Sequence, residues 1–447
     1  MRIRLLHLWE QLRSSYWFIP ALMTVSAIVL AFVMLVVDER VKTMPFWAFR
    51  WLYRGGMDGA QAVLSTIAGS MITVAGVTFS VVIVAFTLAS TQFGPRILLT
   101  FMRDLGNQVV LGTFIATFVY CLVVLWTTGG SDHPTQVPAL SVALAVGMAL
   151  ASLGVLIYFV HHAAASIQAP NIVAEVGRDL DDAIGRFFAG EMQTGSASPA
   201  PAAVLPEGFE AEARPLPAAA SGYLQAVDEA GLMAIARQRD VLLRLNFRPG
   251  DFVTCGSALA HAWPGERSDS VVQAEVEAAF LLGNQRTPTQ DVGFVVNQLV
   301  EVAVRALSPA INDPFTAMTC IDWLGAALAR IARSPVPRRY QHDEDGRLRL
   351  VLRPMTFARA TDFAFEPIRE YGAAAPLIVL RLLQMILTVS EHVCHDEDRE
   401  ALLRQARLIE EESRGASPRT WEREDVRARY AEVLAALSPE RAPGAGR

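Results

Sequence analysis

A row of small and hydroxyl-bearing residues runs through a stretch that has no charged side chain between Gly59 and Pro95. Its members are spaced alternately three and four residues apart, which keeps them on one face of a helix. The row consists of Thr66, Gly69, Thr73, Gly76, Ser80, Ile83, Thr87 and Ser90. Hydroxyl oxygens can solvate an ion or a small polar solute, and glycines let helices approach closely. This hydroxyl row is therefore suited to line a polar path or to pack helices tightly.

Both interpretations of the hydroxyl row have support in the sequence. If copies of the chain surround an axis, the hydroxyls form polar rings one heptad apart, roughly 10 Å by helical rise. Ile83 would then form an apolar constriction between two rings. Alternatively, Gly69 with Thr73 and Gly76 with Ser80 are small-x-x-x-small pairs, which are typical of helix packing. The two interpretations overlap, because an oligomer also needs packed helices.

Two arginines follow the hydroxyl row. A helix is expected to end at Gly94, because Pro95 disfavours helical backbone in the residue before it. Arg96 comes next, and Arg103 follows seven residues later. Arginine at a helix end anchors it at the membrane surface, whereas a ring of arginines at a pore mouth would attract anions.

A second candidate site lies between Arg305 and Thr316. Ser308 and the proline after it are expected to end one helix, and Asn312 or Asp313 to cap the next. Helix capping accounts for most of the residue types between Arg305 and Thr316. The alternative is a ligand or anion at the start of the second helix, with Arg305 and Thr316 contributing contacts.

The sequence contains no recognisable catalytic motif. We find no nucleophile elbow, no paired carboxylates at a suitable spacing and no glycine-rich phosphate loop. His392 and His395 are three residues apart, but they lack a second pair of metal ligands. We therefore expect a chain that is not an enzyme and that has no cofactor and no metal.

The elements that position these residues are apolar stretches long enough to cross a membrane. The chain has 447 residues, of which 52% are hydrophobic. Four stretches meet the requirement of about 17–25 apolar residues for a bilayer span. They lie at about 17–37, 62–90, 109–126 and 139–160. None of them contains Asp, Glu, Lys or Arg, which argues against a pump or a proton-coupled carrier.

Charge predicts the orientation and excludes one class of partner. The net charge is −6 with no basic block, so no nucleic-acid partner is expected. With the N-terminus inside, the inner side would carry Arg2, Arg4, Arg13, Arg96, Arg103, Arg178 and Arg186. The outer side would carry Arg40, Lys42, Arg50 and Arg54. The excess on the inner side predicts a multi-pass protein of the bacterial inner membrane with both termini in the cytoplasm. Four cysteines without a close pair agree with a reducing cytoplasm.

The predicted fold is membrane α-helical, with four transmembrane helices followed by a cytoplasmic α+β domain. Residues 1–165 form the transmembrane domain, and 166–220 a connecting helix and an Ala/Pro-rich linker. Residues 221–265 form a small β-rich module, within which the Gly-Asp-x-Val-x-x-Gly rhythm resembles the barrels of lipoyl-type domains without their modified lysine. Residues 266–395 form a mainly helical domain, and 396–447 a charged helix and a disordered tail.

Several strings carry a resemblance to a known family. Arg305 to Ala317 reads Arg-Ala-Leu-Ser-Pro-Ala-Ile-Asn-Asp-Pro-Phe-Thr-Ala, and Gln290-Asp291 precedes it. In the membrane half, Thr78-Phe79-Ser80 leads to the string from Ser90 to Arg96. Together they resemble a bacterial family of predicted integral membrane proteins that is catalogued only as a domain of unknown function. The resemblance implies four spans and a cytoplasmic domain, and it implies no activity.

These observations predict a passive, homo-oligomeric channel for ions, anions included, or for small solutes. The second span would line its path. The alternative is a non-conducting membrane-anchored sensor or scaffold whose cytoplasmic domain binds a ligand or a partner protein of unknown identity. It is favoured by the size of the polar part and by the charged helix after Asp396. In either case the expected partners are the lipid bilayer and, for the channel, other copies of the chain.

Overall fold

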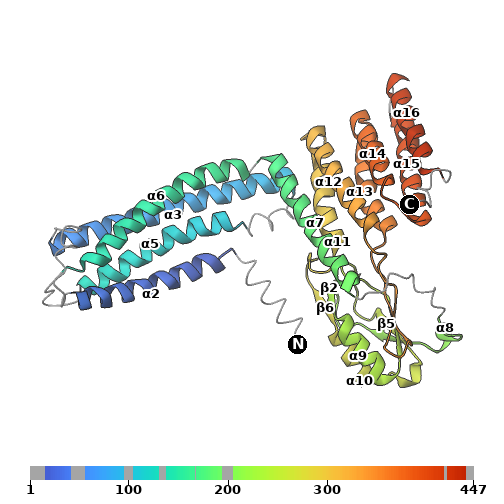
Figure 1. The fold of residues 1–447 in the computed structure, drawn as a ribbon, viewed down its shortest axis with the longest axis horizontal. Coiled ribbons are helices and arrows are strands. Elements are labelled where there is room, and N and C mark those ends of the chain that lie inside the picture. Colours follow the sequence, from blue (N-terminus) through green and yellow to red (C-terminus); the bar gives the residue numbers. More distant parts are fainter. Residues whose placement is uncertain are drawn as a thin grey trace, which may run out of the picture. The chain divides into compact units, whose positions relative to one another are not determined.

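The computed structural model describes residues 16–41, 56–94, 104–129, 137–166, 168–193, 205–416 and 420–438. The chain divides into two compact units, Met1–Asn171 and Ile172–Arg447. The first unit contains long apolar helices, and the second combines helices with two β-sheets (Figure 1).

The helices of the first unit are α2 (Phe18–Val41), α3 (Met57–Phe93), α5 (Leu105–Gly129) and α6 (Ala139–Ser166). Each of the four apolar stretches expected from the sequence forms one of them. At about 1.5 Å per residue, each is long enough to cross a hydrocarbon core of about 30 Å. The 37 residues of α3 extend past the predicted stretch at both ends, and the helix ends at Gly94 with φ of 105°.

A fifth helix is also long and apolar enough to cross a membrane. It is α12 (Pro314–Arg333), which belongs to the second unit. In its apolar stretch 61% of the residues are buried inside the protein, compared with 17% in α3.

Helix α5 occupies the middle of the first unit. Half of its apolar stretch is buried, against 17% for α2 and α3 and 22% for α6. Two polar contacts join it to α6: the Thr117 hydroxyl lies 3.2 Å from that of Ser152, and the Tyr120 hydroxyl donates to the Ser141 carbonyl at 3.1 Å. Such hydrogen bonds help to hold helices together where the surroundings offer no polar partner.

Carboxylates clamp the two ends of α6. The buried Asp38 of α2 accepts hydrogen bonds from the backbone N–H groups of Leu140 and Ser141, at 3.0 and 2.9 Å, and from the Ser141 hydroxyl. These N–H groups lie at the start of α6, where the helix has no earlier carbonyl to accept their hydrogen bonds, so Asp38 takes that role. At the other end, Asp104 lies 2.6 Å from Nε2 of His162.

The second unit contains a five-stranded and a three-stranded sheet. The larger has the order β1 (Arg214–Pro217), β5 (Ala258–Trp263), β3 (Leu242–Leu245), β8 (Leu348–Val351) and β7 (Tyr340–His342). The smaller has the order β4 (Phe252–Val253), β2 (Gly222–Val227) and β6 (Phe280–Gly283). Among the strands of the described residues, β3 and β8 are the one pair that runs in parallel. Residues 221–265 thus supply only part of these sheets, since β1 comes from earlier in the chain and β6, β7 and β8 come from later.

Short helices cover the sheets, and aspartates cap the starts of two of them. These helices are α8 (Phe209–Glu212), α9 (Glu229–Arg239), η3 (Gly265–Arg267) and α10 (Ser270–Ala278). Asp228 caps α9 and Asp269 caps α10 through backbone N–H groups. Leu232 of α9 and Val276 of α10 pack into the same core as Leu224 of β2.

The remaining helices form a layer of their own. They are α7 (Ala169–Gln193), α11 (Val292–Ala306), α12, α13 (Phe357–Gly372), α14 (Pro376–Ser390), α15 (Asp396–Ala416) and α16 (Thr420–Leu437). The sequence predicts one helix from Phe365 to His395, whereas the structure breaks it between Gly372 and Pro376. Proline lacks the N–H that a continuous helix needs and disfavours helical backbone in the residue before it.

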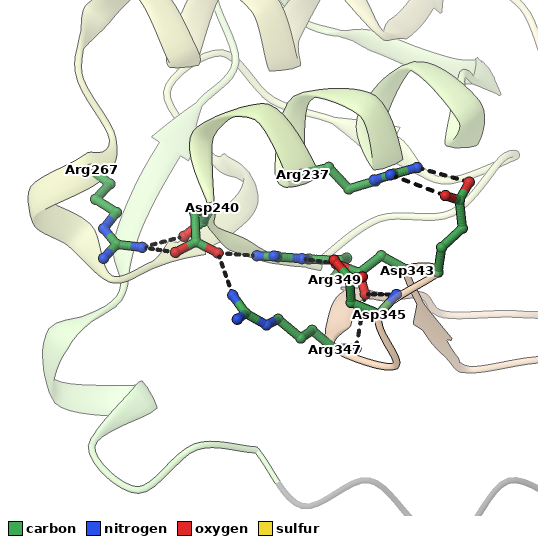
Figure 2. A network of polar contacts seen from close by, with 8 residues as sticks. Arg237, Asp240, Arg267, Asp343, Asp345, Arg347 and Arg349 are labelled. Carbon is green, nitrogen blue, oxygen red and sulfur yellow. Dashed lines mark hydrogen bonds and ion pairs between the residues drawn. The ribbon is translucent and has the colours of Figure 1, made fainter.

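A network of arginines and aspartates holds β8 against the end of α9 (Figure 2). The Arg349 guanidinium donates to Asp240 at 2.8 Å and to Asp343 at 2.7 Å, while Arg267 donates to the Asp240 carboxylate and carbonyl. Hydrogen bonds from Arg349, which has the larger effect, and from Arg267 lower the pKa of Asp240 below its usual range. Arg349 does the same for Asp343. These contacts help to fix the parallel pairing of β3 with β8.

The network should make stability depend on pH. Because the pKa values of Asp240 and Asp343 are lowered in the folded state, their contribution is complete above about pH 4, the value for unfolded aspartate, and is lost as the pH falls further. Arg349→Met should lower the melting temperature at pH 7, and the difference from wild type should shrink at pH 3. Arg237→Met, which removes an exposed ion pair with Glu344, should change little at either pH. An equal difference at both pH values would contradict the role of the carboxylates.

The Asp38 clamp also predicts a stability change. Asp38→Ala should lower the free energy of unfolding by about 1–2 kcal/mol, the usual cost of losing a side chain that caps a helix start. Asp38→Asn should cost less, because its amide oxygen still accepts a hydrogen bond. The exposed neighbour Glu39 provides the control substitution Glu39→Ala. Melting of the purified protein measures all three, and equal effects of the substitutions at 38 and 39 would rule out the clamp.

Candidate functional site

The hydroxyl row lies on the exposed face of α3. Seven of its eight members are exposed, and Ser90 is half-buried. A methyl group added to Gly69 or Gly76 would meet no described atom within 4 Å. The opposite face of α3 packs into the unit through Ala60, Leu64, Ala68, Ala75, Thr78, Val82, Ala89 and Phe93. The exposed members of the row, from Thr66 to Thr87, therefore face away from the packed side of α3.

The hydroxyls of the row are bonded to the helix that carries them. Thr66, Thr73, Ser80 and Thr87 donate to the carbonyls of Ala62, Gly69, Gly76 and Ile83 at 2.7, 2.8, 2.9 and 2.9 Å. Each is the carbonyl four residues earlier, a geometry that satisfies the hydroxyl proton locally. The oxygen lone pairs stay available, so the face presents hydrogen-bond acceptors without a charge.

The structure does not test the prediction for the two candidate pore-mouth residues. Arg96 and Arg103 both lie outside the described residues.

The second candidate site forms a single turn between α11 and α12. Asn312 adopts a left-handed conformation with φ of 51°, and its N–H donates to the Ser308 carbonyl. One oxygen of Asp313 accepts from the Thr316 N–H at 3.1 Å, and the other accepts from the Thr316 hydroxyl. Asp313 thus caps α12, with Pro314 at its first position. Arg305 is half-buried at the end of α11. A ligand at this turn stays a prediction.

The structure gathers four arginines that the sequence analysis did not connect. Arg248 follows β3, Arg286 follows β6, Arg353 follows β8 and Arg359 lies in the first turn of α13. These four residues, which we call the Arg248 cluster, span more than a hundred positions of the sequence. Only the pairing of strands from distant segments brings them together, and no local motif marks them.

Two guanidinium groups of the Arg248 cluster flank one aromatic ring. Cζ of Arg248 lies 5.7 Å from the centre of the Phe363 ring, and Cζ of Arg359 lies 5.3 Å from it. The Arg248 side chain is 12% exposed, and its ion pair with Asp251 is long, at 3.6 Å. Burial, followed by the positive charge of Arg359, lowers the pKa of Arg248.

The other members of the cluster are held by fixed partners. Arg286 donates to the buried Asp291 at 2.8 Å, and the second oxygen of Asp291 accepts from the Phe294 N–H at the start of α11. Burial raises the pKa of Asp291, against the effect of Arg286. Arg353 donates to the Asn246 carbonyl at 2.6 Å. Four arginines therefore surround two aspartates, which leaves an excess of positive charge.

Two helix starts lie beside this charge. The side chain of Asp291 caps α11, and that of Thr356 caps α13. A methyl group added to Gly293 of α11 would lie 3.0 Å from Met355, so the two starts are neighbours. Because the N-terminus of a helix carries partial positive charge, both starts add to the field of the arginines.

Comparison with known proteins identifies relatives over most of the chain. Residues 13–388 match the model of a family described as "Predicted membrane protein (DUF2254)". An uncharacterized protein of Mycobacterium tuberculosis H37Rv and one of Mycobacterium bovis are each 33% identical over 364 residues, covering 80% of this chain and 69% of the relative. No solved structure matches. The chain therefore belongs to the DUF2254 family of membrane proteins, the kind of family that its sequence strings resemble.

Proposed function

We propose that the chain forms a homo-oligomeric, passive channel for ions or small solutes, with α3 lining the path. The observation that carries the proposal is the orientation of the hydroxyl row, which faces away from the bundle of its own chain. Since α5 fills the middle of that bundle, a path of this kind needs α3 helices from several copies.

The distribution of charge favours a passive path. In the described helices of the first unit, charged residues occur only near the ends, at Asp38, Glu39, Arg40 and Asp58. Carriers that couple transport to protons or ions commonly use ionisable groups inside the membrane. The outward oxygen lone pairs of the row favour cations, whereas arginines at positions 96 and 103 would favour anions. The sign of the permeant ion is therefore decided by measurement.

The proposed topology has four spans. The fifth apolar helix, α12, carries Asp322 paired with Arg381 of α14, and Arg330 paired with Asp181 of α7. These ion pairs and its buried surface favour a place in the second unit over a place in lipid. The excess of arginine around the expected inner loops supports an inner-membrane location with both termini in the cytoplasm.

Currents across planar bilayers test the channel with a matched pair of variants. Ser80→Leu places a bulky apolar group in the row and should abolish the current. Ser26→Leu makes the same change at an exposed hydroxyl of α2, which is also bonded to the carbonyl four residues earlier, and should leave the current unchanged. Reversal potentials in salt gradients give the sign of the ion.

Two results would reject the α3 path. One is a wild-type protein that passes no current across a range of pH and membrane tension. The other is a Ser80→Leu protein that folds and conducts normally. An assembly of several copies is expected in lipid nanodiscs, and a monomer would also count against the channel.

A second candidate function is supported by the Arg248 cluster. We propose as the alternative a non-conducting, membrane-anchored sensor whose cytoplasmic domain binds an anionic ligand. Desolvated like charges repel one another unless an anion lies among them. The excess of two arginines over the aspartates and the two adjacent helix starts therefore favour a phosphate-sized anion at this place.

Thermal melting with pyrophosphate tests the sensor. At ligand concentrations about tenfold above Kd, binding should stabilise the folded state by about 1.4 kcal/mol, which corresponds to about 2–4 °C in a domain of this size. Potassium chloride at the same ionic strength should have no such effect. Arg248→Met should abolish the shift, whereas Arg237→Met, at an exposed ion pair elsewhere, should keep it. Equal shifts in both variants, or in chloride, would reject the site.

A further inference from the structure

Exposed apolar side chains of the second unit gather at one end of its helical layer. Seven large hydrophobic residues are exposed in the described part of this unit: Phe252, Val271, Ile311, Phe315, Val336, Tyr371 and Leu377. Four of them belong to two turns. Ile311 lies in the turn between α11 and α12, and Phe315 follows it in the first turn of α12; Tyr371 and Leu377 flank the turn between α13 and α14. Phe315 is the most exposed of the seven, at 71%.

The two turns are neighbours in space. A methyl group added to Gly372 would lie 2.5 Å from the Ile378 side chain and 3.5 Å from that of Leu307, which precedes the first turn. Helices α12 and α14 run in the same direction, because Asp322 pairs with Arg381 and Gly325 packs on Met385. Their N-terminal ends therefore lie side by side (Figure 1).

These turns have an unusual composition for surface loops. Asp313, which caps α12, is the one charged residue in Leu307–Asp313, and Gly372–Leu377 has none and reads Gly-Ala-Ala-Ala-Pro-Leu. A contiguous exposed apolar surface usually marks a contact with a partner or a membrane. We call this surface the apolar tip.

The register of α7 against α12 indicates what the apolar tip meets. Trp323 of α12 fills the space over Gly177, and Arg330 fills that over Gly185, so the two helices are parallel. Eight residues before Gly177 is Ala169, and eight residues before Trp323 is Phe315. Each step back is about 12 Å along its helix. Phe315 is therefore level with the start of α7.

A short piece of chain connects the start of α7 to the apolar helix α6. Helix α6 ends at Ser166, and its apolar stretch reaches Ala163. Only five residues lie between the end of that stretch and Ala169. The covalent connection therefore limits how far the start of α7 can lie from the end of that apolar stretch.

We propose that the apolar tip inserts into the headgroup region of the lipid bilayer, with Phe315, Tyr371 and Leu377 as its anchors. Phenylalanine, tyrosine and leucine are suited to this boundary, where an apolar body is buried and a hydroxyl stays wet. Since the turns carry no arginine or lysine, the contact depends on apolar burial and not on anionic lipid. The proposal requires that α6 crosses the membrane, and it does not require that α3 conducts.

Spin labels on the full chain test the contact. Cys255 and Cys394 are exposed and are first replaced by serine, and the buried Cys121 and Cys320 remain. Labels are then attached at Phe315→Cys and Leu377→Cys. Matched controls are Val336→Cys and Phe252→Cys, which are similarly exposed but lie outside the two turns. The protein is reconstituted in vesicles of pure phosphatidylcholine.

At positions 315 and 377, we expect collisions with oxygen to exceed collisions with a water-soluble nickel chelate several-fold. The ratio should be reversed at positions 336 and 252, and anionic lipid should leave all four ratios unchanged. Ratios at 315 and 377 that match the controls would overturn the proposal. Labels shielded from both reagents would also overturn it, because a protein partner would then cover the tip.

Measurements on the same vesicles separate this proposal from the channel. Unchanged melting of each labelled variant shows that it folds. If the tip is in lipid and no current is seen, only the α3 path fails. If current is seen and the tip is in water, only the tip contact fails.

Discussion

A hydrocarbon environment cannot hydrogen-bond a polar group, and the first unit of this protein is organised by that constraint. Its long helices satisfy their own backbone, as a membrane requires. The hydroxyls of the row on α3 donate hydrogen bonds to carbonyls of the same helix. Asp38 lies near the end of α2, where its charge meets the free amides of α6. Polar groups are thus either satisfied locally or placed at helix ends, and the hydroxyl row can be exposed without an unpaired donor.

The second unit uses charge in two different ways. Around Asp240 and Asp343, arginines and aspartates are matched closely, and the result ties distant strands together. In the Arg248 cluster, arginines exceed aspartates, and the nearly buried guanidinium of Arg248 makes only a long ion pair, at 3.6 Å, with Asp251. The first arrangement is complete within the chain. The second has the electrostatic character of a place that an anion would complete.

The family string from Arg305 to Ala317 combines two roles within one turn. Asp313 and Thr316 start α12, so the polar residues of the string are committed to capping. Ile311 and Phe315 point outward and are not used by the fold of the second unit. The structure therefore separates what builds the turn from what the turn can touch.

Hydrophobic length and helix-breaking residues determined much of this protein from the sequence alone. The four apolar helices of the first unit, the start of α12 at Pro314 and the cap at Asp313 follow from local rules about burial and capping. The break between α13 and α14 has a local cause in Pro376, although the apolar run around it suggested one helix. Tertiary structure alone decided which face of α3 packs, because both faces are uncharged. Tertiary structure alone also assembled the residues of the Arg248 cluster and, separately, those of the apolar tip. Contacts between residues that are far apart in the sequence depend on strand pairing and helix packing, which no short stretch of sequence encodes.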